Sequence, residues 1–228
     1  NQVNLVNRAG LSLNFWDGGD STKYNDGQVA GGSGTWRVGA PGDGWTDMDG
    51  KLNANWAQSQ FAVFGGKAGT VTVSNAGGTV RITGAQFAAD GYVVQGDAIE
   101  LGASGTVVRV GDGSGTDTAR SETLNVALTG TGGLVKEDVG RLILGGTNSY
   151  TGGTTVKAGV LQGSATSLQG NIVNDAEVAF DQDKTAGTYA GTMSGSGRLR
   201  KIGSGTLVLG SANSHAGGTF VDAGTLAT

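Results

Sequence analysis

Residues 134–161 read LVKEDVGRLILGGTNSYTGGTTVKAGVL, and residues 199–226 read LRKIGSGTLVLGSANSHAGGTFVDAGTL. The second stretch follows the first at an offset of 65 residues with no gap. Self-similarity at a fixed period is typical of stacked architectures, in which each unit buries its apolar face against its neighbours. The repeat therefore predicts a solenoid. The shared positions in the first copy are Leu134, Lys136, Gly140, Leu142, Leu144, Gly145, Asn148, Ser149, Gly152, Gly153, Thr154, Val156, Ala158, Gly159 and Leu161.

The composition favours an ordered, glycine-rich β protein. The 228 residues include 45 glycines, one proline and no cysteine, so glycine is about three times as frequent as its usual share of roughly 7%. The apolar residues lie in short alternating runs at regular intervals, which a disordered low-complexity segment would lack. The absence of cysteine excludes disulfides, thiolate metal sites and thiol nucleophiles.

The charge balance argues against two classes of partner. The net charge is -4, and no basic stripe is present to neutralise nucleic-acid phosphates or to bind an anionic membrane surface. We therefore expect no nucleic-acid partner. No apolar run of membrane-spanning length and no signal peptide is found, and the chain opens with Asn1, so we expect a mature or excised segment.

Short β-branched segments separated by glycine-rich turns predict an all-β protein. Long windows with apolar residues at helical spacing do not occur, and glycine interrupts nearly every stretch of ten residues. Turn signals such as Asp90-Gly and Gly145-Gly separate the expected strands. These strands are Thr70 to Ser74, Thr79 to Thr83, Tyr92 to Gln95, Thr106 to Val110, Thr123 to Leu128, Arg141 to Leu144, Thr154 to Lys157, Val160 to Gln162, Asn171 to Asn174 and Glu177 to Phe180.

The spacing of inward residues favours a parallel β-helix over a sandwich of hairpins. Leu142, Leu161, Phe180 and Leu199 recur every 19 residues, which suits one turn of a three-faced coil better than a hairpin of about 8 to 12 residues. The offset of 65 residues then spans roughly three coils.

Glycine and asparagine mark the expected turns of the repeat. Asparagine tolerates a left-handed backbone and can bond neighbouring peptides, and glycine supplies positive φ angles. The predicted turn residues are Gly140, Asn148, Gly152, Gly153 and Gly159 in the first copy and Gly205, Asn213, Gly217, Gly218 and Gly224 in the second.

The first part of the chain differs from the rest. Residues 1–66 are rich in aromatic side chains and predict a cap or variant coils, whereas residues 67–228 predict regular β-helix coils. An aromatic cluster would protect the terminal coil from edge-to-edge association, and the alternative is a platform on which glycans stack. The aromatic residues concerned are Trp16, Trp36, Trp45 and Trp56.

Residues 128–162 and 193–227 resemble the passenger-associated β-strand repeat of bacterial autotransporters. Residues 14–19, NFWDGG, resemble a region that often precedes such repeats. The second copy departs from the pattern at His215, where the first copy has Tyr150, and at Arg198 and Arg200.

The resemblance implies a right-handed parallel β-helix, secreted through the periplasm and outer membrane of a Gram-negative bacterium by a C-terminal β-barrel not included here. It further implies display at the cell surface as a non-enzymatic adhesive or scaffold module whose repeats assist export and folding. The implied partners are a host or neighbouring bacterial surface and its glycans. Two alternatives remain, namely a β-helix enzyme acting on extracellular polysaccharide and a self-associating module for bacterial aggregation.

The residues give little support to an active site or a metal site. His215 is the single histidine and occupies a position that holds tyrosine in the other copy, so a structural role is expected. Residues 111–115, GDGSG, and residues 47–50, DMDG, are best read as turns, because the remaining features of a nucleophile loop or calcium loop are missing. We predict no catalytic residue, cofactor or metal. The one dense acidic cluster, expected to be a charged face, is Asp175, Glu177, Asp181 and Asp183.

Overall fold

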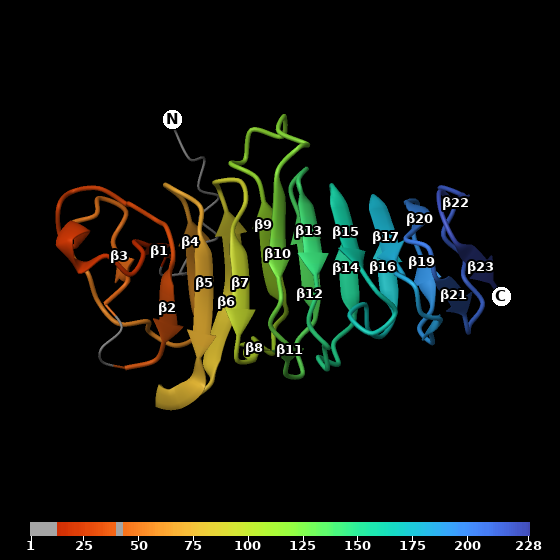
Figure 1. The fold of residues 1–228 in the computed structure, drawn as a ribbon, viewed down its shortest axis with the longest axis horizontal. Helices are drawn as coiled ribbons and strands as arrows, with labels where there is room; N and C mark the ends of the chain where they lie inside the picture. Colours follow the sequence, from red (N-terminus) through yellow and green to blue (C-terminus); the bar gives the residue numbers. More distant parts are fainter. Residues whose placement is uncertain (1–12, 40–42) are drawn as a thin grey trace.

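A computed structural model describes residues 13–39 and 43–228, and these residues stack into an elongated column of β-strands (Figure 1). Within this described part the chain has two short 3-10 helices, η1 at Ser21–Lys23 and η2 at Asn75–Gly77, and no helix that could cross a membrane. Successive coils pair in parallel along the column. The predicted all-β parallel solenoid is confirmed.

The described strands form sheets of eleven, nine and three strands. Sheet 1 contains β1 (Leu13–Trp16), β3 (Trp45–Thr46), β4 (Gln60–Phe64), β6 (Val80–Phe87), β8 (Ile99–Leu101), β9 (Thr106–Val110), β11 (Leu128–Thr129), β12 (Leu134–Glu137), β14 (Thr154–Val156), β16 (Ile172–Asn174) and β19 (Met193–Ser194). Sheet 2 contains β2 (Gly34–Arg37), β5 (Thr70–Ser74), β7 (Val93–Gly96), β10 (Ser121–Leu124), β13 (Arg141–Leu144), β15 (Val160–Gly163), β17 (Glu177–Asp181), β20 (Arg198–Ile202) and β22 (Thr219–Val221). Sheet 3 contains β18 (Gly187–Tyr189), β21 (Thr206–Leu209) and β23 (Thr225–Ala227).

The inward row of sheet 2 corrects one expectation from the sequence. Leu161 pairs with Val178, and Val178 pairs with Leu199, so Val178 takes the place that the 19-residue spacing assigned to Phe180. Phe180 lies in the next inward row, opposite Gly163 and Lys201. The reason is that successive coils differ in length, because the turns between sheets absorb extra residues.

Some expected strands have other bounds. The stretch Thr123 to Leu128 is two strands, β10 and β11, because the chain turns a corner between them. β6 runs on to Phe87, since its first half pairs with β8 and its second half with β4 and β9.

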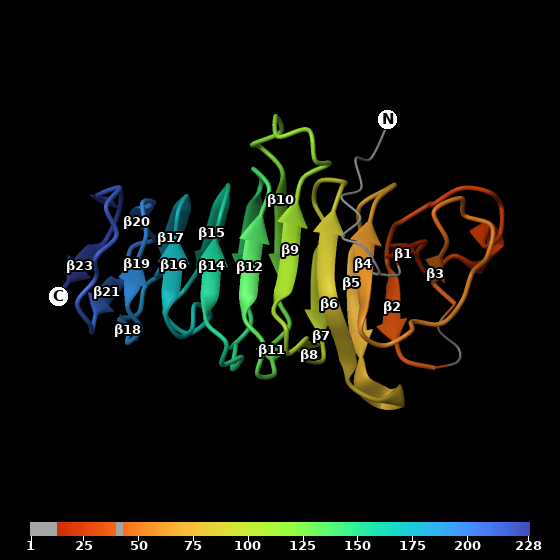
Figure 2. The same ribbon diagram turned by 180° about the vertical axis from the view of Figure 1, so that it is seen from behind.

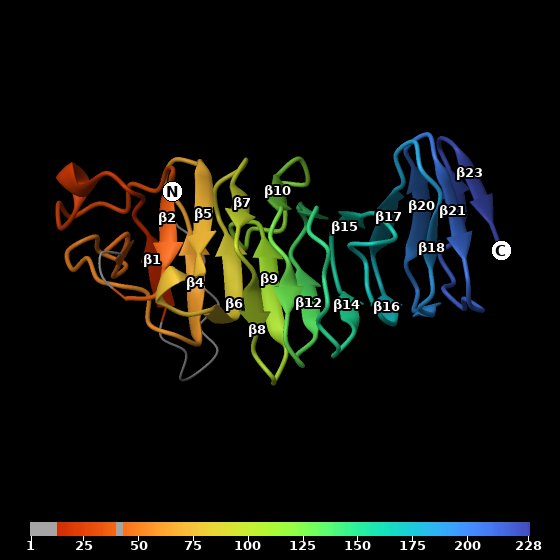
Figure 3. The same cartoon turned by 60° about the horizontal axis from the view of Figure 1, so that its bottom comes forward.

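The two sequence repeats lie on different faces of the column. Residues in register on successive coils of sheet 1 are Leu134, Thr154, Ile172 and Met193. These three coils use 59 residues, so the offset of 65 leaves six more and carries the second copy around one corner. The offset therefore spans three coils and one further face, which is one face more than the three coils predicted. β12 of sheet 1 corresponds to β20 of sheet 2, and β13 of sheet 2 corresponds to β21 of sheet 3. β9, β12, β14 and β16 of sheet 1 lie side by side in Figure 2, and β18, β21 and β23 of sheet 3 lie near the C-terminal end of the column in Figure 3.

The N-terminal end of the column is filled by tryptophan. The ring centroids of Trp45 lie 5.1 Å from Trp16, 5.0 Å from Trp36 and 4.6 Å from Trp56. β1 pairs in parallel with β4 and antiparallel with β3, so an antiparallel strand follows the last parallel pair of sheet 1. The parallel pairing also continues across residue 66, because β2 pairs with β5. A capping role for this end stays a prediction.

Candidate functional site

Lys136 is a buried lysine whose ammonium group ties two coils together. Its side chain points inward from β12 and is 0% exposed. The Nζ atom donates to the carbonyl oxygens of Glu137 at 2.9 Å, Asp138 at 2.7 Å and Ala158 at 3.1 Å. Ala158 belongs to the following coil, so one cation satisfies carbonyls on both sides of a coil boundary. Burial lowers the pKa of Lys136 to about 8, and the carboxylates of Asp138 and Glu137 oppose that shift.

Lys201 repeats this arrangement in the second copy. It is also 0% exposed, and burial lowers its pKa. Its Nζ atom donates to the carbonyl oxygens of Ile202 at 2.7 Å, Gly203 at 2.7 Å and Ala223 at 3.2 Å. Each acceptor lies 65 positions after its counterpart. We call the two lysines the lysine staples. Both lysines belong to the sequence repeat, but no role was predicted for them. The available signal was a lysine at an inward position of a strand whose side chains alternate between the interior and the surface.

Asn148 and Asn213 clasp neighbouring coils by their side-chain amides. The Oδ1 atom of Asn148 accepts from the backbone N–H of Leu128 at 2.8 Å, and its Nδ2 donates to the carbonyl of Ser167 at 2.7 Å. The Oδ1 atom of Asn213 likewise accepts from the N–H of Met193 at 2.7 Å. Both residues bond peptides of other coils, but neither has the positive φ that the sequence reading allowed for them.

The repeat glycines serve two purposes. Gly153 has a φ of +75° and Gly218 of +85°, whereas Gly152 and Gly217 have no positive φ. At Gly152 a Cβ would lie 2.3 Å from the backbone N of Gly133 in the preceding coil. The positive-φ group also includes Gly159 and Gly224, and the close-approach group includes Gly140 and Gly205.

All four tryptophans are inside the column. Their exposed fractions are 0% for Trp16, 1% for Trp36, 1% for Trp45 and 2% for Trp56. The indole N–H of Trp16 donates to the carbonyl of Gly32 at 2.8 Å. Because the rings pack edge to face against one another, none of them presents a free face on which a glycan could stack.

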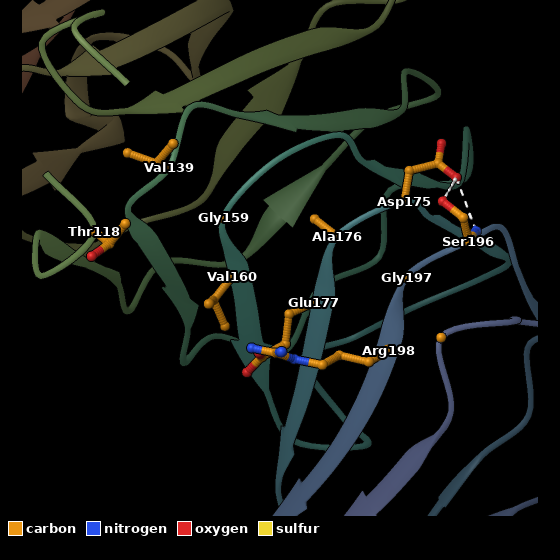
Figure 4. Close-up of a pocket in the computed structure, with 11 residues that line it drawn as sticks. Thr118, Val139, Gly159, Val160, Asp175, Ala176, Glu177, Ser196, Gly197 and Arg198 are labelled. Atoms are coloured by element: carbon orange, nitrogen blue, oxygen red, sulfur yellow. Dashed lines mark hydrogen bonds and ion pairs between the residues drawn. The ribbon is translucent and has the colours of Figure 1, made fainter. Parts of the chain in front are cut away.

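A shallow groove of about 510 Å³ follows the corner between sheets 1 and 2 (Figure 4). Thr118 lines one end, and the other end carries two polar contacts. Asp175 Oδ1 accepts from the N–H and hydroxyl of Ser196 at 3.1 and 3.2 Å. Glu177 Oε2 accepts from Arg198 Nε at 2.6 Å, and the arginine covers the glutamate, whose side chain is 5% exposed. The polar groups of the groove therefore contact one another.

The predicted acidic cluster is split by the length of β17. Glu177 begins the strand and Asp175 lies two residues before it, whereas Asp181 ends the strand and Asp183 lies two residues after it. Asp181 accepts from Gln162 Nε2 at 3.0 Å, and the Ser204 hydroxyl donates to Asp183 at 3.4 Å. The structure thus does not gather the four carboxylates into one site.

The remaining sequence candidates lie in local turns or contacts. His215 Nε2 is 2.9 Å from the hydroxyl oxygen of Thr219, the same contact that the Tyr150 hydroxyl makes with Thr154 at 2.7 Å. Asp112 accepts from the N–H of Ser114, and Asp47 accepts from that of Lys51. Over residues 13–39 and 43–228 no group of three or more histidine, cysteine, aspartate or glutamate side chains is arranged to hold a metal.

The repeated corner residues lie in sequence that is similar to known proteins. A family model described as the passenger-associated transport repeat matches residues 134–162 and 199–227. The chain is 43% identical over 259 residues to a Brucella suis biovar 1 (strain 1330) protein named adhesin BmaC autotransporter. That alignment covers 99% of this chain and 8% of the relative, so the chain spans a small part of the relative's length. No solved structure matches the chain. The chain is thus identified as autotransporter passenger sequence that carries two passenger-associated transport repeats.

Proposed function

We propose that this chain is a non-enzymatic module of a passenger displayed at the surface of a Gram-negative bacterium. Its stacked coils form an adhesive scaffold, and its transport repeats assist export by locking each coil to the next as it folds outside the cell. The partner surface belongs to a host cell or a neighbouring bacterium, and surface glycans are the ligand class we favour.

The main support for this proposal is that the second repeat is rotated by one face about the column axis relative to the first. What recurs at an offset of 65 residues is the interior and the corners, namely the lysine staples, the asparagine clasps and the glycines. The outward side chains of corresponding strands look in different directions, because the copies lie on different sheets. A repeated binding motif would gain by presenting its copies on one face, so the repeated part is better suited to coil assembly than to ligand contact.

The surface contacts support a scaffold over an enzyme. The carboxylates of Asp175, Glu177, Asp181 and Asp183 each contact a neighbouring side chain, and the four lie at two separate corners. A glycoside hydrolase requires two carboxyl groups facing each other across the scissile bond. The relative named above is called an adhesin, which agrees with an adhesive role for this chain.

The adhesive part is tested with the purified chain on beads. We expect saturable attachment to cultured host cells, competed by free chain, with beads coated by the heat-unfolded chain as the control. A glycan array then assigns the ligand class. Attachment no greater than that of the control beads would reject the adhesive role, and turnover of a polysaccharide would favour the enzyme instead.

The export part is tested in cells that make the whole passenger. Substituting both lysine staples by methionine should lower the amount of passenger displayed, while adhesion per displayed molecule stays unchanged. Equal display of the variant and the parent would show that the staples are not needed for export.

A further inference from the structure

An exposed aromatic ring lies on the outer face of sheet 2, near the C-terminal end of the column. Phe220 in β22 is 50% exposed, and it is the one exposed aromatic side chain among the residues that the structure describes. It pairs in register with Arg200 of β20. The ring reaches over Gly218, where a Cβ would lie 3.7 Å from Phe220 Cε2. Because glycine has no side chain, the ring can lie along the sheet at this point.

A pocket of about 220 Å³ opens beside this ring, and we call it the Phe220 pocket. Its lining residues are Arg198, Arg200, Phe220 and Asp222. Arg198 also lines the corner groove described above, so the two hollows adjoin. The side chains of Arg198, Arg200 and Asp222 are 54%, 38% and 39% exposed. The pocket therefore surrounds an apolar ring with charged groups that reach solvent.

Ion pairs hold both arginines of the Phe220 pocket in place. Arg198 Nε donates to Glu177 Oε2 at 2.6 Å, and the two side chains lie side by side in Figure 4. Arg200 Nε donates to Asp222 Oδ2 at 3.0 Å, and Arg200 Nη1 lies 3.6 Å from Glu177 Oε1. A guanidinium group carries five N–H donors, so each arginine keeps donors that these contacts do not use. Both hydrogen bonds from Arg200 to Asp222 go to Oδ2, which leaves Oδ1 as an acceptor.

The residues of the Phe220 pocket depart from the sequence repeat. The inward residues of β20 and β22 are the same as their counterparts 65 positions earlier, whereas all four pocket residues differ from theirs. The counterparts of the pocket residues are Gly133, Val135, Thr155 and Lys157. Because the first copy stacks its coils without these four side chains, coil stacking does not account for them.

The chemistry of the Phe220 pocket suits a neutral sugar. A pyranose ring has an apolar C–H face that stacks on an aromatic ring, and its hydroxyl groups both donate and accept hydrogen bonds. An apolar surface with a few polar groups around it is the usual composition of a small-ligand site. The charges of the two arginines are cancelled by those of Glu177 and Asp222, and the whole chain carries a net charge of -4. An acidic sugar would therefore meet no excess of positive charge.

We propose that the Phe220 pocket binds neutral glycan, with one pyranose ring stacked on Phe220. The hydroxyl groups of that ring donate to Asp222 Oδ1 and accept from the N–H groups of Arg198 and Arg200. This inference rests on the proposed adhesive function, for which it names the ligand class and the residues that bind it. We expect a dissociation constant on the order of 1 mM for one sugar ring, and many copies at a cell surface would strengthen such a contact by multivalency.

Saturation-transfer NMR on the purified chain tests the pocket directly. The probes are methyl β-D-galactoside, whose C3–H, C4–H and C5–H bonds lie on one face of the ring, and the methyl α-glycoside of N-acetylneuraminic acid, which is acidic. We expect the galactoside to bind, with the largest transfer to those three ring protons, and the acidic glycoside to bind about tenfold more weakly or less. Absence of transfer to the galactoside, or tighter binding of the acidic glycoside, would overturn the proposal.

Substitutions in the pocket separate the ring from the polar groups. F220A should weaken binding of the galactoside about tenfold or more, whereas F220W should keep it, because an indole offers a larger face. D222N should also weaken binding, because an amide is a poorer acceptor for sugar hydroxyls than a carboxylate. V173A is the matched control, because Val173 is 44% exposed and lies on sheet 1, away from the pocket. Equal transfer in F220A and the parent would exclude stacking on Phe220.

The result can be told apart from that of the bead assay. Circular dichroism checks that each variant is folded, and if F220A unfolds, binding by D222N as tight as that of the parent would reject the pocket. If beads attach to cells while F220A and the parent bind the galactoside equally, the site is wrong and the adhesive function stands. If the galactoside binds as expected but beads do not attach, the adhesive function fails and the sugar site stands.

Discussion

Lys136 and Lys201 make the same three hydrogen bonds on two different faces of the column. Lys136 projects from β12 of sheet 1, and Lys201 projects from β20 of sheet 2. A cation buried without a carboxylate partner is costly, but three carbonyl acceptors replace much of its hydration. The corner of the coil, rather than a particular sheet, is therefore the unit that the repeat preserves.

Replacing a lysine staple should destabilise the column locally. K136M leaves three buried carbonyl groups without their donor, and we expect a loss of about 1–3 kcal/mol in the free energy of unfolding, part of it offset because no charge is then buried. Urea denaturation followed by circular dichroism gives the value. K157M, on the outer face of the following coil, should change stability by less than about 0.5 kcal/mol. Equal effects of the two substitutions would mean that the buried hydrogen bonds add nothing.

The amide clasp of Asn148 should tolerate neither alanine nor aspartate. N148A leaves the N–H of Leu128 and the carbonyl of Ser167 unpaired in a buried place, at a cost of about 2–3 kcal/mol. N148D keeps an acceptor for Leu128 but sets a carboxylate against the carbonyl of Ser167, so it should be at least as destabilising. Thermal unfolding compares both with S149A, an exposed neighbour. A fully stable N148D protein would contradict the assigned amide orientation.

Glu122 should make stability depend on pH. Burial raises the pKa of its carboxyl from 4.5 to about 8, although the N–H groups of Tyr92 and Gly91 donate to it at 2.5 and 3.2 Å and counteract the shift. Asp90 raises this pKa further and Arg120 lowers it. Between pH 4.5 and 8 the folded chain holds a proton that the unfolded chain has released, so this group's contribution is full below pH 4.5 and is lost as the pH rises to 8.

The expected fall in unfolding free energy across that window is about 2–4 kcal/mol. Denaturant titrations at the two ends of the window measure it. In E122Q the fall should largely disappear, whereas E100Q, at a half-buried glutamate paired with Arg81, should keep it. A slope that persists unchanged in E122Q would assign the titration to another group.

Gly84 should resist substitution although its φ is ordinary. An alanine Cβ would lie 2.5 Å from the Phe61 ring and 2.8 Å from the carbonyl of Val107, so G84A should cost about 1–3 kcal/mol. G65A is the matched control, because its Cβ meets nothing within 4 Å. Adding F61A to G84A should recover part of the loss by removing the ring. If G84A and G65A unfold at the same temperature, the close approach of Phe61 is not present in solution.

The stacked-coil fold could be predicted from the sequence, but the register of the inward residues on successive coils could not. The stacked fold could be read because glycine spacing and alternating apolar residues report directly on turns and on the inner face. The displacement of Phe180 by Val178 could not be read, since it depends on how many residues each turn absorbs. The sequence repeat identified both lysine staples as repeated residues. Their role could not be predicted, because their acceptors are backbone carbonyls, which leave no signature in a sequence. The burial of Trp45 and its neighbours likewise required the three-dimensional packing.

The step of one face between the two repeats bears on how such a protein can grow. If a duplicated unit equalled a whole number of coils, its outward residues would line up on one side of the stalk. A unit of three coils plus one face instead places each new copy a third of a revolution further around the column axis. The new copy can stack there because Lys136 and Lys201 make the same hydrogen bonds at their corners. Duplication by this unit would thus multiply the directions from which the stalk can be approached.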